Sequence, residues 1–152
     1  MLEEKIKKES KIRKFHIQKI YIKDVSFESP YAPKIFKKTW NPKISCDLNT
    51  ISDKLEENLF EVVLRVTVKV NIERKLVFLC EVNQAGIFYI QGIKKIELPH
   101  CLNAYCPSIL FPYVRENISS LTSKGGFPQL NLEPVNFDLA FSKIQSKNDL
   151  KD

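Results

Sequence analysis

Apolar and polar residues alternate along four segments of the chain before Gly92, and such alternation predicts half-buried β-strands. The clearest segment covers residues 60–72, where thirteen residues at about 3.3 Å each would span roughly 43 Å. Its apolar face is Phe60, Val62, Leu64, Val66, Val68, Val70 and Ile72. Weaker alternation predicts further strands over 15–27, 44–48 and 76–83, and the last should pair with 60–72 as a long hairpin.

The pattern changes to a helical period after Gly92. Ile93, Ile96, His100 and Ala104 begin it, and Leu110, Val114, Ile118 and Leu121 mark the apolar face of a longer helix. Lys124 and Gly125 suit the end of that helix, and Asn136 suits the cap of a last one. Strands followed by helices predict an α+β protein, with a four-stranded antiparallel sheet and helices packed on one face.

Composition predicts one folded domain. The chain has 152 residues, of which 43% are hydrophobic and 28% charged, as in ordinary globular proteins. The N-terminus is charged and no apolar run reaches the roughly 20 residues that span a bilayer, so we expect neither a secretory signal nor membrane insertion. Cys46, Cys80, Cys101 and Cys106 then read as reduced thiols in a cytoplasmic protein.

The net charge of +6 is concentrated at one end. Residues 1–23 carry eight basic and three acidic side chains, whereas residues 24–152 carry sixteen and fifteen. A basic arm of this kind serves either as a solubilising terminus, which is the commoner case, or as a nucleic-acid-binding segment. We therefore divide the chain into a basic flexible arm over 1–14, a folded domain over 15–145 and a flexible tail over 146–152.

Candidate chemistry is sparse. Neither GxxxxGK nor GxGxxG is present, so the common nucleotide-binding loops are excluded. His100, Cys101 and Cys106 resemble part of a zinc site, but a fourth ligand is missing from their neighbourhood in the sequence. We therefore expect no metal, no cofactor and no enzymatic activity. The ten Phe, five Tyr and one Trp instead favour a β-rich binding module with an apolar groove.

Residues 81–137 carry a longer pattern. It contains GIFYI, then HCLNAYCPSILFPYVRENISSLTSKGGFPQLNLEPVNF, and upstream stand IYIKDVSFESPYAP and FEVVLRVTV. Together these segments closely resemble the bacterial protein-export chaperone SecB over roughly residues 15–141. The resemblance implies a cytosolic, ATP-independent holdase that assembles as a dimer of dimers. It would bind unfolded preproteins and deliver them to the SecA motor, with neither nucleic acid nor membrane insertion expected.

The same resemblance assigns roles to individual residues. It implies a SecA-binding surface at Asp24, Glu28, Leu79 and Glu81. It implies a client groove at Trp40, Ile44, Cys46, Leu48, Phe60 and Phe141. It implies subunit contacts at His100, Cys101, Leu110, Val114, Ile118 and Leu121.

Two alternatives to export remain open at this point. One is a SecB-like chaperone dedicated to a toxin–antitoxin partner, and retention of the four SecA positions speaks against it. The other is a nucleic-acid-binding module that uses residues 1–23. This chain also departs from the family, which is usually acidic, and the departure predicts weaker long-range attraction to a basic SecA tail.

Overall fold

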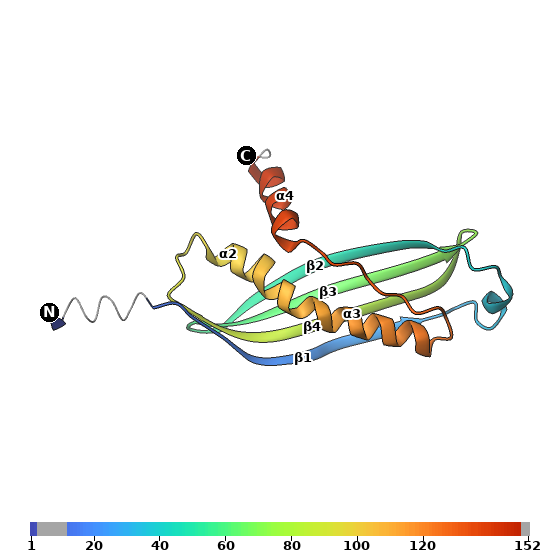
Figure 1. Cartoon of the computed structure of the whole chain (residues 1–152), viewed down its shortest axis with the longest axis horizontal. Helices are drawn as coiled ribbons and strands as arrows, with labels where there is room; N and C mark the ends of the chain where they lie inside the picture. The colour runs from blue at the N-terminus through green and yellow to red at the C-terminus, as the bar shows by residue number, and fades with distance from the viewer. Residues whose placement is uncertain (3–11, 150–152) are drawn as a thin grey trace.

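The computed structural model describes residues 1–2 and 12–149, and it contains one sheet with helices after it (Figure 1). All neighbouring strands are antiparallel, and their order across the sheet is β1-β4-β3-β2. The strands are β1 (Lys14–Glu28), β2 (Lys43–Glu56), β3 (Leu59–Ile72) and β4 (Lys75–Gln91). The predicted α+β class with a four-stranded antiparallel sheet is therefore confirmed.

Two strands are longer than their patterns predicted. β2 continues through Asp53 to Glu56, because an edge strand exposed on both faces tolerates polar side chains. β4 continues to Gln91 because the polar side chain of Gln84, although buried, is paired. Its amide nitrogen donates to the carbonyl of Tyr21 at 3.0 Å, and its oxygen accepts from Asn117 at 3.2 Å.

The core lies between the two central strands and one long helix. The alternating apolar face of β3 is almost completely buried, and Phe78, Cys80, Val82 and Phe88 of β4 extend it. α3 (Cys106–Lys124) covers this face. It approaches closely at Gly86, where an added Cβ would stand 2.7 Å from the Phe88 ring and 3.2 Å from Leu110. A side chain at that position would push the helix from the sheet.

The helical region starts later than its spacing predicted. α2 (Leu98–His100) begins with Pro99 in its first turn, and η2 (Cys101–Tyr105) is one wide π-turn that leads into α3. In η2 the Cys106 N–H bonds to the Cys101 carbonyl. Pro107 follows and has no N–H to donate to the regular series of helical hydrogen bonds. A proline at such a position therefore favours a local change of helix type. At the far end of α3, the Gly125 N–H donates to the Leu121 carbonyl at 2.8 Å, which confirms the predicted end of this helix.

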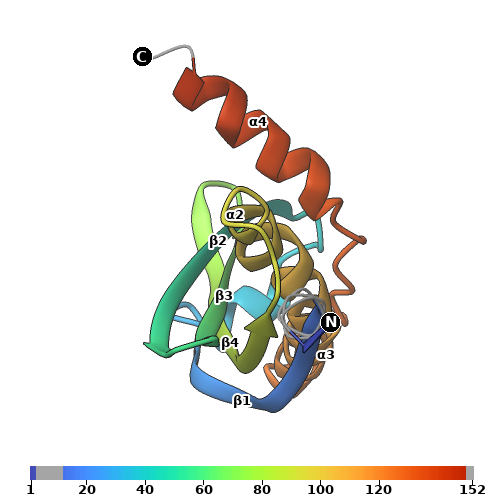
Figure 2. The same ribbon diagram turned by 90° about the vertical axis from the view of Figure 1, so that its left-hand side faces the viewer.

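α4 (Phe137–Asp149) stands apart from the sheet (Figures 1 and 2). Asn136 caps it as predicted, because its side-chain oxygen accepts from the Leu139 N–H at 3.0 Å. The helix packs chiefly on η2, and its residues Phe137 and Phe141 pack on the same core as α3, so both helices lie on one side of the sheet as predicted. α4 also runs past residue 145, the predicted end of the folded domain. Residues 3–11 of the predicted arm and 150–152 of the tail lie outside the described residues.

Among the helices that the structure describes, none has the length and hydropathy required to cross a membrane.

Candidate functional site: an apolar cleft beside the edge strand β2

β2 presents a row of apolar side chains that the core does not use. Ile44, Cys46 and Leu48 pair in register with Val70, Val68 and Val66 of β3, so they share the face that α3 covers further along the sheet. They remain exposed, because α3 lies over β3 and β4 and does not extend across β2. Ile44 keeps 50% and Leu48 38% of its surface in contact with solvent.

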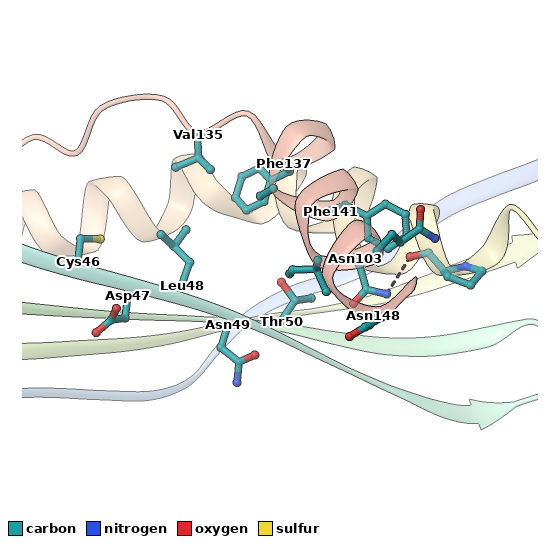
Figure 3. Close-up of a pocket in the computed structure, with 14 residues that line it drawn as sticks. Cys46, Asp47, Leu48, Asn49, Thr50, Asn103, Val135, Phe137, Phe141 and Asn148 are labelled. Atoms are coloured by element: carbon teal, nitrogen blue, oxygen red, sulfur yellow. Dashed lines mark hydrogen bonds between the residues drawn. The ribbon is translucent and has the colours of Figure 1, made fainter. Parts of the chain in front are cut away.

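The first turns of α4 and the segment before it form the opposite wall of a cleft. Val135, Phe137, Phe141 and Ile144 face β2 across a cavity of about 570 Å³, which Cys46, Leu48 and Thr50 line from the strand side (Figure 3). In Figure 3, Leu48 points up toward Val135 and Phe137. Because side chains alternate across a strand, Asp47 and Asn49 point the other way. The cleft wall is thus mainly apolar.

Aromatic side chains form a cluster near the start of β2. The loop after β1 contains η1 (Lys34–Lys37) and brings Phe36 and Trp40 against Phe127, with ring centres 5.1 and 6.0 Å apart. Phe127 also contacts Phe78 of the core at 5.2 Å. Phe36 and Trp40 are about half exposed, so the cluster anchors the loop and leaves aromatic surface to solvent.

Five of the six predicted groove residues therefore border this face of the molecule. Cys46, Leu48 and Phe141 line the cleft, Ile44 continues it along β2, and Trp40 stands where β2 begins. Phe60 does not belong to the groove surface. Phe60 is on β3, between β2 and β4, and pairs with Phe88 of β4. Only 8% of its surface is exposed, so it is a core residue.

The predicted subunit contacts need a larger correction. Leu110, Val114 and Ile118 have no exposed surface, because they form the face of α3 that packs on β3 and β4. Cys101 is also buried and Leu121 partly so. The apolar helical spacing of these residues therefore reflects the internal contact of helix and sheet. His100 alone of the six is well exposed, and Tyr105 of η2 and Tyr113 of α3 also present aromatic surface to solvent.

The four predicted SecA-binding residues share one surface, the sheet face opposite to α3. Glu28 pairs with Leu79, and Ser26 with Glu81, so β1 and β4 bring the predicted positions side by side. Asp24 pairs with Asn83 one step further. Asp24 and Glu28 are exposed, whereas Leu79 and Glu81 are partly buried.

Hydrogen bonds hold Glu81 in place on this outer face. Its carboxylate accepts from the Thr67 hydroxyl at 3.0 Å and from the Asn83 amide at 3.4 Å. The Arg65 Nε lies 3.8 Å from it and donates to Asn83 at 2.8 Å. Arg65 therefore offsets part of the charge of Glu81, which leaves Asp24 and Glu28 as the more accessible carboxylates of the four.

A second cluster of polar side chains joins β1 to β3 on the same face. The Tyr21 hydroxyl and the Lys23 ammonium both donate to Glu61, Lys23 at 2.7 Å. The hydrogen bond from Lys23, with that from Tyr21, lowers the pKa of Glu61. Burial, with the hydrogen bond to Glu61, raises the pKa of Tyr21 to about 12. These groups link strands, and their environment is that of a structural network.

Three of the four thiols, those of Cys80, Cys101 and Cys106, are buried. Cys80 and Cys106 are fully buried, and burial raises the pKa of Cys80 to about 11. His100 meets Asp138 of α4 at 2.5 Å. In the part of the chain that the structure describes, His, Cys, Asp and Glu residues do not gather in a group of three or more suited to a metal.

The fold and cleft define a class of protein: an α+β domain with an open, mainly apolar cleft beside an edge strand. Comparison with known families identifies it further. The family model described as "Preprotein translocase subunit SecB" matches residues 8–148, and the chain belongs to that family. A chaperone role follows from the family.

A solved structure agrees on the fold. The SecB-like chaperone Rv1957 of Mycobacterium tuberculosis, in complex with a ChAD peptide from the HigA1 antitoxin Rv1956, matches with a TM-score of 0.68. That match covers 80% of this chain and 90% of the other at 20% identity. A protein of unknown function from Streptococcus agalactiae matches with a TM-score of 0.45 over 80% of this chain and 98% of that one, at 13% identity.

Proposed function

We propose that this chain is an ATP-independent holdase that keeps preproteins unfolded in the cleft between β2 and α4. The observation that carries this proposal is the exposed apolar row of β2 opposite the aromatic side chains of α4. A folded protein buries its apolar segments, whereas an unfolded one presents them and gains about 25 cal/mol for each Å² that a binder covers. Selectivity for unfolded chains then needs neither nucleotide nor sequence recognition.

The backbone of β2 supports the same proposal. β2 is an edge strand of the sheet, so one side of its backbone has no partner strand among the residues that the structure describes. An extended polypeptide that lies along such an edge pairs through main-chain hydrogen bonds, which are independent of sequence. Binding to the unfolded state withdraws it from aggregation and from premature folding by mass action.

We further propose that the chain hands its clients to SecA and works as a homotetramer in the cytoplasm. The shared location of Asp24, Glu28, Leu79 and Glu81 on the outer face supports the first point, since that face is separated from the cleft by the thickness of the sheet. The same molecule could then engage both partners at once. Light scattering should give a mass near four times 17.7 kDa, and a monomer at every concentration would contradict the tetramer.

A chaperone dedicated to one antitoxin is the competing proposal, because the Mycobacterium protein with this fold is recorded with an antitoxin peptide. The two proposals differ in the range of clients that the chaperone binds. A dedicated chaperone protects one partner, whereas an export chaperone binds many unrelated unfolded preproteins and also SecA.

One experiment separates these outcomes. The affinity of the chain is measured for two unrelated preproteins, each in its unfolded and its folded form, with and without SecA and without nucleotide. We expect both unfolded forms to bind at least about tenfold tighter than their folded forms, and SecA to join the complex. Equal affinity for folded and unfolded forms would contradict the holdase proposal. Absence of SecA binding, with unfolded chains still held, would contradict only the export role.

A further inference from the structure

We propose that the basic tip at the start of β2 selects client segments in which acidic residues flank the apolar stretch. We define the basic tip as the loop over 29–43 together with the β3–β4 turn over 71–75. It is an interaction surface of one charge sign at the end of the cleft. The proposal rests on the proposed function, because it concerns what the same cleft binds.

The charge of the tip is local. Its two segments carry six basic residues and a single acidic one, Glu73. The basic residues are Lys34, Lys37, Lys38, Lys43, Arg74 and Lys75. The rest of the chain from residue 24 onward carries ten basic and fourteen acidic residues. A general enrichment in lysine would not produce this contrast, so the tip is a distinct feature of the surface.

Contacts between the two segments make the tip one surface. Lys38 meets Glu73 at 3.1 Å, which neutralises the only carboxylate of the tip. The Lys75 ammonium stands 5.7 Å from the centre of the Tyr31 ring. Between the segments lies a hollow of about 610 Å³, lined by Thr39, Asn41, Lys43, Asn71, Ile72, Glu73 and Arg74. All six basic side chains are exposed.

The tip is continuous with the proposed client cleft. Lys43 is the first residue of β2 and directly precedes Ile44, the first of its exposed apolar residues. Leu48, in the cleft, is five residues from Lys43, which is roughly 17 Å along an extended strand. A bound chain with its apolar stretch at Leu48 would therefore bring flanking residues about five positions away to the tip.

The charge of the tip decides which flanks are favoured. Carboxylates that arrive there meet five cations without an acidic neighbour in the two segments, since Lys38 already has Glu73. Basic flanks would meet repulsion at the same distance. Since the groups are exposed, the effect acts over about 8 Å at physiological salt and weakens as salt is added. The apolar contribution of the cleft does not weaken in this way.

The test uses three peptides with the same six-residue apolar centre and flanks of Asp and Glu, of Ser and Gly, or of Lys. On the full-length chain at low salt we expect the acidic-flanked peptide to bind at least about tenfold tighter than the neutral one, and the basic one weakest. The acidic advantage should shrink to less than about threefold at 0.5 M salt. Equal affinities of the three would overturn the inference and leave the holdase proposal standing. Failure of all three to bind would contradict the holdase proposal itself.

A charge-reversed variant locates the effect. The double substitution Lys43→Glu with Arg74→Glu should reverse the order of the acidic-flanked and basic-flanked peptides. Its matched control is Lys94→Glu with Lys95→Glu, which changes the net charge equally in the loop after β4, at the other end of the sheet, and should leave the order unchanged. If both variants change the order alike, net charge and not the tip is responsible. If the tip variant does not fold, the flank and salt series on the native chain still decides.

A single-stranded oligonucleotide is the competing ligand for the basic tip. If the tip bound it more tightly than the acidic-flanked peptide, the tip would be assigned to nucleic acid and the inference overturned.

Discussion

β2 and β3 are neighbours of equal length, fourteen residues each, yet they have opposite relations to solvent. The alternating apolar residues of β3 are buried, because α3 covers one face and strands flank it on both sides. The apolar residues of β2 lie in register beside them and remain exposed. Alternation alone therefore does not distinguish a core strand from a strand with an exposed apolar face. The position of the strand in the sheet and the reach of the covering helix make the difference.

The largest expected effect comes from truncating a core residue of β3. Leu64 has no exposed surface, so Leu64→Ala should lower the free energy of unfolding by about 2–5 kcal/mol through the lost contacts and the cavity left behind. Chemical denaturation measures this. A loss below about 1 kcal/mol would show that β3 is not the rigid core strand described above.

Leu48→Ala makes the corresponding change on β2 and should act on binding. Because Leu48 is partly exposed in the free chain, we expect stability to change by less than about 0.5 kcal/mol. Affinity for an unfolded polypeptide should fall by about 1–2 kcal/mol, roughly five- to thirtyfold. Titration calorimetry measures the affinity and chemical denaturation the stability, each against Ile51→Ala, a control on the opposite face of the same strand. Equal effects of the two variants would contradict the role of the cleft face.

The other edge strand sharpens the contrast, since side chains tie β1 to β3 and do not tie β2 in this way. Tyr21→Phe removes the hydroxyl that donates to Glu61 and should cost about 1–2 kcal/mol of stability. Tyr89→Phe, which loses a bond to the neutral amide of Gln91, is the matched control and should cost less. An equal loss in both would indicate that the Glu61 charge contributes nothing.

The same pair predicts a pH dependence with a definite sign. The lowered pKa of Glu61 contributes stability at neutral pH that is lost as pH falls through that lowered pKa. The raised pKa of Tyr21 contributes stability that is lost as pH rises through about 12. The difference between the native chain and Tyr21→Phe should therefore be constant near neutral pH and shrink toward both extremes. Denaturation at a series of pH values measures it.

The smallest expected effect concerns the wall of the cleft opposite β2. His100 and Asp138 join α2 and α4, but their side chains are 51% and 76% exposed. Exposed ion pairs contribute little, so His100→Gln should change the free energy of unfolding by less than about 0.5 kcal/mol. Thermal denaturation tests this. A loss above about 2 kcal/mol would mean that α4 is an integral part of the core.

The sequence was most informative where apolar residues alternate without interruption. The pattern of residues 60–72 predicted β3 almost to its ends. It missed the second half of β4, because a buried glutamine with two partners looks like a polar break until the partners are known. It missed the π-turn η2 for a similar reason, since the effect of Pro107 depends on the helix around it.

The candidate site shows the same limit. Alternation together with the family resemblance pointed to Cys46 and Leu48, and the resemblance alone to Phe141, and all three line the cleft. Val135 and Asn103, which also line the cleft, carry no sequence signal, because they reach it only through the path of the chain. Leu110, Val114 and Ile118 were assigned to an interface because an apolar helix face looks the same whether a second subunit or the chain's own sheet covers it.

The accessibility of Cys46 tests the central claim most directly. Cys46 is exposed in the cleft, whereas Cys80, Cys101 and Cys106 are buried, so a thiol-specific alkylating reagent should modify Cys46 first. Burial, with the neighbouring Asp47, raises the pKa of Cys46, so the reaction should be measured at mildly alkaline pH. As a control, the background Cys46→Ser with Asn49→Cys carries a thiol on the opposite face of β2. The account predicts that a saturating unfolded preprotein slows alkylation of Cys46 at least about tenfold, that its folded form does not, and that the thiol at position 49 stays reactive. An unchanged rate at Cys46 while the unfolded chain is demonstrably bound would contradict the account.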